Sequence, residues 1–456
     1  MYEIVIKNGT IVDPVHGCYK ANVGIENGRI MTISNTKLTG TNYIDATDKY
    51  ISPGFIDIHM HEDLPEDCVE WNEVKSIKYE IFKHMARMGV TTSIGGNCGL
   101  GDLNISKYYN IINKQGAPTN YLGFVGNVRL REAVGNHDCY APSSNSQLKS
   151  MGQMLRKELK DGAIGLAFGL EYAPGTSLEE IIYLSKIVSE YPDKMVAIHY
   201  RFDASRSLEA IAEMIIVARE TGVKLQISHI GSCSAFGYME ESLRMISEAR
   251  KNNIDIMADV YPYDAFSTMI GSAVFDSGCF ERWNKDYDSI VIGNGPYAGT
   301  TCDHKLFNHL RNNDPDTLAI AFVMDEEEVS KAIEHPLTMI ASDGLLQQGK
   351  GHPRASSTFP RVLRKYVRED KRLSLQDAIS KMTLVPANRI GLKDRGRLKE
   401  GFIADITIFD FDKITDKATY QEPVKPPVGI EYVLVQGKPV VFNGELTGDY
   451  PGVTLL

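Results

Sequence analysis

The sequence lacks the surplus of positive charge that binding to nucleic acids or anionic membranes requires. Its 456 residues include 49 lysines and arginines against 59 acidic residues, a net charge of −10 at pH 7. A basic surface displaces counterions from phosphate backbones and attracts anionic headgroups, so neither class of partner is expected. The chain also lacks an apolar run near the roughly 20 residues that a membrane span needs.

Cysteines are few, odd in number and irregularly spaced. The seven of them do not resemble the even framework of a small disulfide-bonded secreted domain. The N-terminus (residues 1–9, MYEIVIKNG) lacks a basic stretch followed by a long apolar one, so no secretory signal is expected. These features predict a soluble, reduced, cytoplasmic protein, and they leave its oligomeric state open.

The middle of the chain alternates short β-branched runs with amphipathic stretches, which is typical of βα units on a parallel sheet. The candidate strands are residues 54–58, 90–95, 121–125, 163–168, 195–199, 224–229, 255–260 and 338–342. Eight such strands predict an α/β fold, a (β/α)8 TIM-like barrel. The stretch before the last strand is too long for a simple connection and is expected to contain an insertion.

Both ends of the chain are β-rich instead. Asn8-Gly9 lies between two short β-branched runs and predicts a tight hairpin turn, and residues 404–442 have the same character. We therefore expect the two ends to pair into one small sheet domain. The expected domains are residues 1–50 with 396–456 (a small β-sandwich) and residues 51–395 (the barrel), with an insertion around 264–337.

Side chains able to bind a metal fall where the predicted strands end, and carboxyl strand ends form the active face of such a barrel. These residues are His59, His61, Cys98, His199, His229 and Asp343. Residues two apart in a strand point to the same side, so His59 and His61 can converge on one ion. Thiolate and imidazole are ligands that suit zinc.

Each of these residues has a structural alternative when taken alone. Cys98 could be a small buried residue, and His199 and His229 could be satisfied core histidines. Asp343 could cap the helix that follows it. The coincidence favours a metal centre, because all of them fall at predicted strand ends of one barrel.

Motifs along nearly the whole chain, in order, are similar to those of known amide hydrolases. Residues 53–61 (PGFIDIHMH) resemble the strand-one motif of the amidohydrolase superfamily. Residues 96–99 (GNCG), 259–263 (DVYPY) and 352–354 (HPR) resemble segments of the D-aminoacylase (N-acyl-D-amino-acid deacylase) family within it. These three are more specific to the family than the first motif is.

The resemblance implies a zinc-dependent amide hydrolase that releases the acyl group from N-acyl-D-amino acids or close analogues. Metal-activated water would attack the amide, with Asp343 as the catalytic general base. The implied ligands of one tight zinc ion are Cys98, His199 and His229. His59 and His61 flank this site, and whether they hold a second, weaker ion is left open.

The resemblance also implies a small substrate that carries an amide and a carboxylate. The residues implied to contact that carboxylate, or to lie near it, are Arg354, Tyr261, Ser267 and Tyr172. A guanidinium is a planar two-pronged donor that matches a carboxylate, which supports the role of Arg354.

Two missing lysines bear on the metal and substrate predictions. No lysine occurs between Asp161 and Gly175, so the carbamylated lysine that bridges two metals in many superfamily members is not expected. Residues 229–234 (HIGSCS) also lack the lysine that usually helps bind the substrate carboxylate. Alternatives are an amidohydrolase of cyclic amides or small dipeptides and, third, a non-catalytic barrel. The absence of a bridging lysine disfavours cyclic amides as substrates. The presence of all the candidate metal ligands disfavours a non-catalytic barrel.

Overall fold

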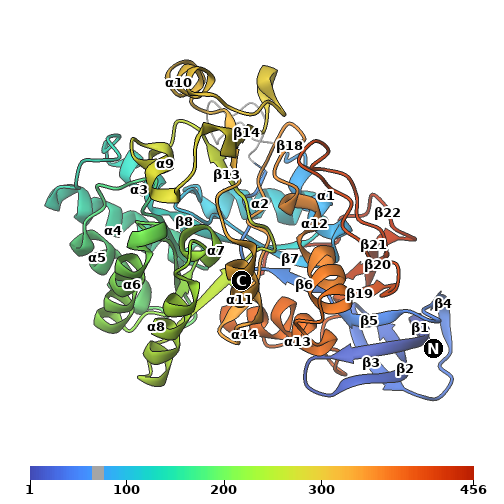
Figure 1. The fold of residues 1–456 in the computed structure, drawn as a ribbon. Helices are drawn as coiled ribbons and strands as arrows, with labels where there is room; N and C mark the ends of the chain where they lie inside the picture. The colour runs from blue at the N-terminus through green and yellow to red at the C-terminus, as the bar shows by residue number, and fades with distance from the viewer. Residues whose placement is uncertain (64–75, 456) are drawn as a thin grey trace.

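The computed structural model describes residues 1–63 and 76–455 and has an eight-stranded parallel sheet at its centre (Figure 1). Its strands are β6 (Phe55–Asp57), β7 (Val90–Gly95), β8 (Asn120–Gly126), β9 (Gly165–Gly169), β10 (Met195–His199), β11 (Leu225–Ile227), β12 (Ile256–Val260) and β16 (Thr338–Ile340). The two edge strands meet through a parallel bridge between Met60 and Gly344 and through the Asp343 N–H, which donates to His59 O at 2.7 Å. The sheet is thus nearly closed, and the predicted barrel is confirmed.

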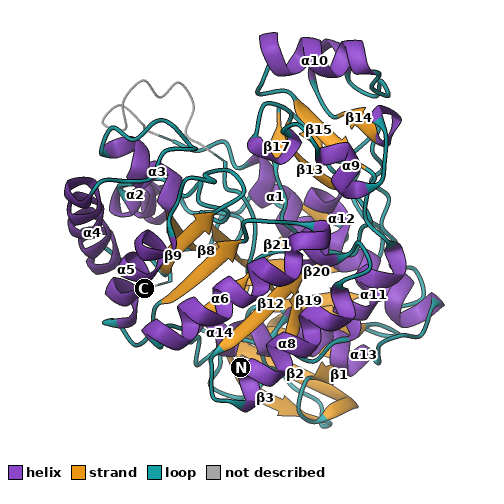
Figure 2. Cartoon of the chain, turned by 60° about the vertical axis from the view of Figure 1, so that its left-hand side comes forward, coloured by secondary structure: helices purple, strands orange, loops and turns teal. Residues whose placement is uncertain are grey.

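Helices cover the outside of the barrel, as Figure 2 shows for α5, α6 and α8. Their ends follow local capping chemistry: Ser144 and Ser177 cap two helix N-termini, and Gly222 ends α6 in the left-handed conformation. The helices that flank the sheet are α1 (Glu80–Arg87), α2 (Ile105–Gln115), α3 (Asn127–Ala133), α4 (Asn145–Lys160), α5 (Leu178–Ser189), α6 (Ser207–Thr221), α7 (Ile230–Ser234), α8 (Met239–Lys251), α11 (Glu326–Glu334), α12 (Arg354–Arg361), α13 (Leu375–Met382) and α14 (Leu384–Ile390).

The long connection between β12 and β16 forms a separate three-stranded antiparallel sheet in the order β13-β15-β14. Its elements are β13 (Phe266–Met269), α9 (Cys279–Trp283), β14 (Ile290–Ile292), α10 (His304–Asn313) and β15 (Leu318–Ala321). These elements lie together at the top of the molecule in Figure 1. An insertion was expected in this stretch, and β13 reaches back from it to the site described below.

Strands from both ends of the chain form one nine-stranded sheet, in the order β22-β21-β20-β19-β5-β1-β2-β3 with β4 beside β1. They are β1 (Tyr2–Asp13), β2 (Gly17–Glu26), β3 (Arg29–Ser34), β4 (Gly40–Asp45), β5 (Tyr50–Pro53), β19 (Ile406–Phe409), β20 (Ile430–Val435), β21 (Lys438–Phe442) and β22 (Glu445–Leu446). The pairing of the two chain ends agrees with the expected fold class. The domain limits stay a prediction.

The hairpin turn predicted at Asn8-Gly9 was wrong. β1 continues through both residues as a single strand, and β2 pairs with it on either side of a register shift between Ile6 and Gly9. Asn8 has a φ of 66°, so the positive φ that favours a turn produces a β-bulge instead. Glycine fits there because a Cβ would lie 2.3 Å from Ile51 Cδ1, so that the Ile51 side chain would have to shift.

Strand β9 approaches β10 so closely that one position tolerates only glycine. A Cβ at Gly165 would lie 1.7 Å from the carbonyl oxygen of Met195. We expect Gly165→Ala to lower the free energy of unfolding by about 3 kcal/mol, because backbone and not a flexible side chain must move. Urea unfolding measures this, with Gly231→Ala as the control, since a Cβ there lies 3.7 Å from its nearest neighbours. Equal stability of the two variants would contradict the strand spacing.

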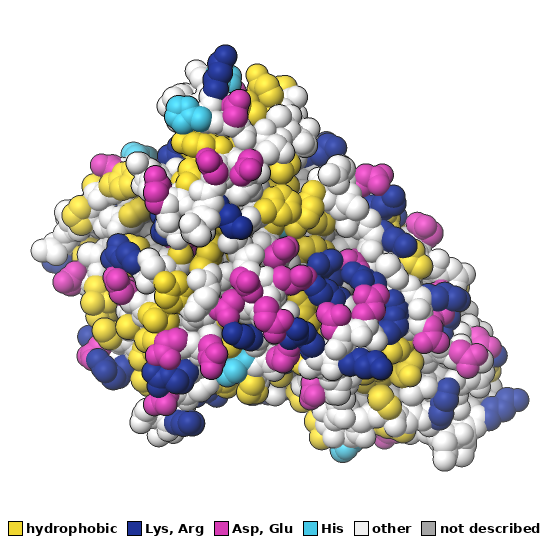
Figure 3. Space-filling model, viewed as in Figure 1, with side chains coloured by type: hydrophobic (Ala, Val, Ile, Leu, Met, Phe, Trp, Pro, Cys, Tyr) yellow, Lys and Arg dark blue, Asp and Glu magenta, His cyan; other side chains and the backbone are white. Residues whose placement is uncertain are grey.

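Side chains of both signs are interspersed over the lower part of the face in Figure 3. Arg372 forms two surface ion pairs with α11: its Nη2 lies 2.5 Å from Glu327 Oε2, and its Nη1 lies 2.9 Å from Glu334 Oε1. Exposed pairs of this kind contribute little stability individually. Of the helices in residues 1–63 and 76–455, none is both long and apolar enough to cross a membrane.

Candidate metal centre and substrate pocket

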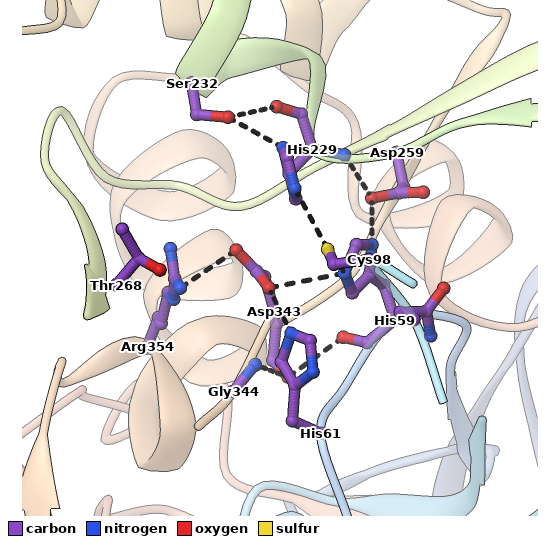
Figure 4. A network of polar contacts seen from close by, with 12 residues as sticks. His59, His61, Cys98, His229, Ser232, Asp259, Thr268, Asp343, Gly344 and Arg354 are labelled. Atoms are coloured by element: carbon purple, nitrogen blue, oxygen red, sulfur yellow. Dashed lines mark hydrogen bonds and ion pairs between the residues drawn. The ribbon is translucent and has the colours of Figure 1, made fainter. Parts of the chain in front are cut away.

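The predicted metal-binding side chains converge at the carboxyl ends of the barrel strands, and Figure 4 shows this for His59, His61, Cys98, His229 and Asp343. Cys98 follows β7, and its Sγ lies 3.3 Å from His59 Nε2 and 3.3 Å from His229 Nε2. The His61 and His199 rings lie alongside, with ring centroids 5.7 Å from His59 and 4.5 Å from His229, respectively. Five residues from four separate strand ends therefore face one small volume.

The sulfur at the centre of this group favours its charged form. Burial raises the pKa of the Cys98 thiol, but the imidazoles of His59 and His229 outweigh burial and hold the pKa well below its usual value. A thiolate is the form of cysteine that binds metals. His59, Cys98, His229 and Asp343 each offer a ligand atom within 4.8 Å of the others. Thiolate, imidazole and carboxylate together fit a zinc ion.

His199 lies beside the same volume but has other contacts than His59 and His229. Its Nε2 lies 2.9 Å from Glu171 Oε2, while its Nδ1 is buried and has no hydrogen-bond partner among the described residues. A carboxylate on one ring nitrogen is the usual way in which proteins orient a metal-binding histidine. Glu171, His199 and Cys233 form a second close group, in which Glu171 has this orienting geometry. The orphaned Nδ1 leaves His199 one nitrogen for an ion.

Two further polar residues orient the other histidines. Asp259 Oδ1 lies 3.1 Å from His59 Nδ1 and accepts the backbone N–H of His229 at 2.7 Å. Ser232 Oγ lies 2.7 Å from His229 Nδ1. Both histidines are thereby left with Nε2 facing Cys98. The sequence analysis gave neither Asp259 nor Ser232 a role, although an aspartate in a largely buried strand is itself a signal.

Three residues of the centre lie in the left-handed region of backbone space. Cys98, His229 and Asp343 have φ values of 55°, 32° and 48°. Such backbone costs about 1–3 kcal/mol per residue and persists where its surroundings over-determine it. The bond from Asp343 N–H to His59 O and that from His229 N–H to Asp259 provide this restraint. The local strain turns all three side chains toward one another.

Asp343 lies between the histidines and a buried arginine. Its Oδ1 is 3.1 Å from His61 Nε2 and 3.3 Å from His59 Nε2, and its Oδ2 is 2.9 Å from Arg354 Nη2. Burial raises the pKa of the Asp343 carboxyl, but Arg354, His229 and His59 outweigh burial and hold it well below its usual value. Asp343 is therefore an ionised carboxylate beside the metal-binding group.

A small, partly open pocket lies next to Asp343. All four predicted substrate-binding residues line it: Arg354, Tyr261, Ser267 and Tyr172. Arg354 Nε and Nη1, the Tyr261 hydroxyl and Ser267 Oγ are buried without a hydrogen-bond partner in the described part of the chain. Buried donors left unpaired are costly, which makes this end of the cavity suited to an anionic group.

Other residues that line the cavity were not predicted. Among them, Glu171 and Asp203 follow β9 and β10, Ser232 is on α7, and Phe266, Thr268 and Val274 come from the insertion. In the stretch after His229 that lacks the expected lysine, Ser232 contacts the histidine ring. Asp203 is an acidic residue in the strand-five continuation, four positions after His199.

Comparison with known proteins places the chain among amide hydrolases. Residues 311–441 match the model of the Amidohydrolase family. The chain is 32% identical to N-acyl-D-glutamate deacylase of Alcaligenes xylosoxydans xylosoxydans, an alignment that covers 95% of this chain and 93% of the relative. A solved structure of N-acyl-D-glutamate deacylase from Bordetella bronchiseptica, complexed with zinc and a phosphonate inhibitor, superposes with a TM-score of 0.86, 29% identity and coverage of 100% and 99%. A D-aminoacylase structure gives 0.87, 27% identity and full coverage of both chains.

Proposed function

Because this chain belongs to the N-acyl-D-amino-acid deacylase family of the amidohydrolases, we propose that it is a zinc-dependent amide hydrolase that releases the acyl group from N-acyl-D-amino acids. The observation that carries this proposal is the adjacency of two features. A thiolate–imidazole group suited to zinc surrounds the carboxylate of Asp343, and unpaired cationic and hydroxyl donors line the cavity beside it.

The ion would be held by Cys98, His199 and His229, and His59 and His61 lie beside it for a second, weaker one. Zinc at such a site supplies a Lewis acid that polarises the amide carbonyl and makes water nucleophilic near neutral pH. The donor set supports zinc because the Cys98 thiol is held in its metal-binding form.

The remaining chemistry belongs to residues of the chain. Asp343 would accept a proton from the attacking water and deliver it to the leaving nitrogen, acting as general base and then as general acid. The low pKa of its carboxyl keeps it ready to accept that proton. Arg354 would hold the substrate carboxylate through the Nε and Nη1 groups that have no described partner, and Tyr261 and Ser267 would add neutral hydrogen bonds.

A turnover screen tests this function. The zinc-loaded protein is incubated with paired N-acetyl-D- and N-acetyl-L-amino acids, and the released amine is measured. Turnover confined to the D series is expected. Absence of turnover in both series with zinc bound would overturn the proposal and redirect the search to dipeptides and cyclic amides. Cyclic amides are disfavoured because the stretch from Asp161 to Gly175 has no lysine to bridge two metals.

The role of Arg354 gives a prediction of its own. We expect Arg354→Gln to raise KM for an N-acetyl-D-amino acid about 10–100-fold, since a charge-assisted bond to a carboxylate contributes roughly 1.5–3 kcal/mol. The same variant should lose far less on the matching N-acetyl-D-amino-acid amide, which has no carboxylate. Arg311→Gln is the control, because Arg311 pairs with Asp276 and does not line the cavity. An equal loss on both substrates would contradict carboxylate binding by Arg354.

A further inference from the structure

The guanidinium of Arg354 is held from several sides. Its Nη2 lies 2.9 Å from Asp343 Oδ2 and donates to Ser267 O at 3.2 Å, and its Cζ lies 4.5 Å from the centroid of the Tyr261 ring. The Nε and Nη1 groups offered to the substrate carboxylate keep their direction only while this arrangement holds. A two-pronged bond is lost when the guanidinium turns away, so the contacts that fix Arg354 also set the affinity for a carboxylate.

Arg354 is the first residue of α12, and a histidine ring fixes the backbone at this helix start. His352 Nδ1 accepts the Arg354 N–H at 3.0 Å, where Pro353 has no side-chain acceptor to offer. Burial and the charge of Arg354 hold the pKa of the His352 ring well below its usual value, so Nδ1 stays an acceptor. The His352 ring makes edge-to-face contacts with the rings of Tyr263 and Tyr420, at centroid distances of 4.9 and 5.1 Å.

Tyr420 belongs to a loop of the sheet that the two chain ends form. The loop lies in the connection between β19 and β20, and Thr415 and Val428 close its base through backbone hydrogen bonds of 2.9 and 3.0 Å. Beyond this base, residues 416–423 pack on α12 and on the insertion, where the centroid of the Tyr420 ring lies 4.7 Å from that of Phe322. We call residues 416–423 the bracing loop.

Polar contacts join the bracing loop to the helix that carries Arg354. Ser356 Oγ donates to Pro423 O, and Ser357 Oγ accepts the Ala418 N–H at 3.3 Å. Both serines are buried, and both lie within one helical turn of Arg354. The bracing loop therefore holds the first turn of α12 through its backbone as well as through the Tyr420 ring.

Asp416 connects the bracing loop to the segment that carries Tyr261. Its Oδ2 lies 3.2 Å from Arg361 Nη1, and its Oδ1 pairs with Arg364 Nε. Arg361 Nε in turn donates at 2.7 Å to Pro262 O, the carbonyl next to Tyr261. Burial raises the pKa of the Asp416 carboxyl, but the two arginines outweigh burial and hold it below its usual value. Asp416 is therefore an ionised partner of both arginines.

We propose that the bracing loop positions the carboxylate-binding groups of the substrate pocket, with Tyr420 and Asp416 as its positioning residues. Tyr420 acts through the His352 ring on Arg354. Asp416 acts through Arg361 on the segment that follows β12. The sheet formed by the chain ends thus contributes to substrate recognition, although neither positioning residue is among those that line the pocket. The inference rests on the proposed function, because it requires that Arg354 binds a carboxylate.

Steady-state kinetics with two substrates test this role. The zinc-loaded protein is assayed with N-acetyl-D-methionine and with N-acetyl-D-methioninamide, which lacks the carboxylate. We expect Tyr420→Leu and Asp416→Asn each to raise KM for the acid about tenfold and KM for the amide less than about twofold, because a misplaced guanidinium affects only the substrate that it binds. A change in KM of the same size for acid and amide, or no change for either, would overturn the inference.

Two further variants serve as references. Tyr420→Phe keeps the ring that contacts His352 and should recover most of the affinity for the acid that Tyr420→Leu loses. Asp412→Asn is the matched control for Asp416→Asn, since Asp412 is exposed between β19 and the base of the loop and should leave both KM values unchanged. A loss in Tyr420→Phe as large as in Tyr420→Leu would contradict positioning through the ring contact.

A double-mutant cycle excludes a merely structural role. In an Arg354→Gln background, Tyr420→Leu should raise KM for the acid no further, because the group that the bracing loop positions is already absent. Additive effects of the two substitutions would overturn the inference. The thermal unfolding temperature is measured for every variant, and Asp416→Asn replaces Tyr420→Leu in the cycle if the leucine variant does not fold.

Binding separates this inference from the proposed function. Dissociation constants of the acid and the amide are measured by calorimetry on the Asp343→Asn variant, which is expected to be inactive, with and without Tyr420→Leu. Weaker binding of the acid alone supports the bracing loop whether or not the wild-type protein hydrolyses either compound. If Arg354→Gln weakens acid binding selectively and the Tyr420 and Asp416 variants do not, the proposed function stands and the role of the bracing loop is refuted. If Arg354→Gln is not selective either, carboxylate binding by Arg354 fails, and the inference fails with it.

Discussion

Asp343→Asn should lower kcat by about three orders of magnitude while zinc stays bound. Asparagine keeps the size of the side chain, but an amide does not accept the proton that the attacking water must lose. General acid–base catalysis by one positioned group contributes typically 10²–10⁴-fold, and this carboxylate would act twice in the cycle. Its contacts with His59, His61 and Arg354 show how firmly the carboxylate is held in position.

Three measurements on that variant separate catalysis from folding. The value of kcat is compared with zinc per chain and with the thermal unfolding temperature. Asp316→Asn is the control, because Asp316 is exposed in the insertion and should behave as wild type. Normal turnover by Asp343→Asn would remove this residue from the mechanism. Loss of zinc together with turnover would instead make Asp343 a ligand, which its place in the close group with Cys98 also allows.

The barrel could be predicted from the sequence because its signals are local. Buried parallel strands are short β-branched runs, and β7 and β10 have the predicted limits. Metal-binding residue types at the strand ends then indicate the active face before any contact is known. The turn prediction at Asn8-Gly9 was wrong because its signal is not local. Whether a residue with positive φ forms a turn or a bulge depends on how the partner strand β2 pairs with β1.

The polar residues around the centre could not be predicted in the same way. Asp259 in β12 contacts His59 and His229, which follow two other strands, and Asp203 after β10 meets Arg282 of the insertion. These contacts join segments that are far apart in the chain, and no local periodicity indicates them. The prediction that Arg354 meets a carboxylate also lacked one fact, because in this structure its Nη2 already pairs with Asp343.

Cys98→Ala should abolish tight zinc binding. The Cys98 thiolate is the central ligand atom between His59 and His229. Alanine removes this sulfur and leaves a gap between the two imidazoles. We expect zinc to fall from about one ion per chain to background after dialysis against a weak chelator. Wild-type protein should lose stability in the same chelator, since an ion at 1,000 times its Kd stabilises the folded state by about 4 kcal/mol. The variant should show no such dependence.

Cys279→Ala provides the control for this experiment. Cys279 is also a buried, free cysteine, but it lies on α9 in the insertion. It should keep full zinc content and the full stabilisation by the ion, although removal of a buried side chain costs some stability of its own. Full zinc occupancy in Cys98→Ala would contradict the assignment of the tight site. His199 belongs to the group with Glu171 and Cys233 and not to the group around Cys98. Full zinc occupancy without Cys98 would therefore assign the tight site to Glu171, His199 and Cys233.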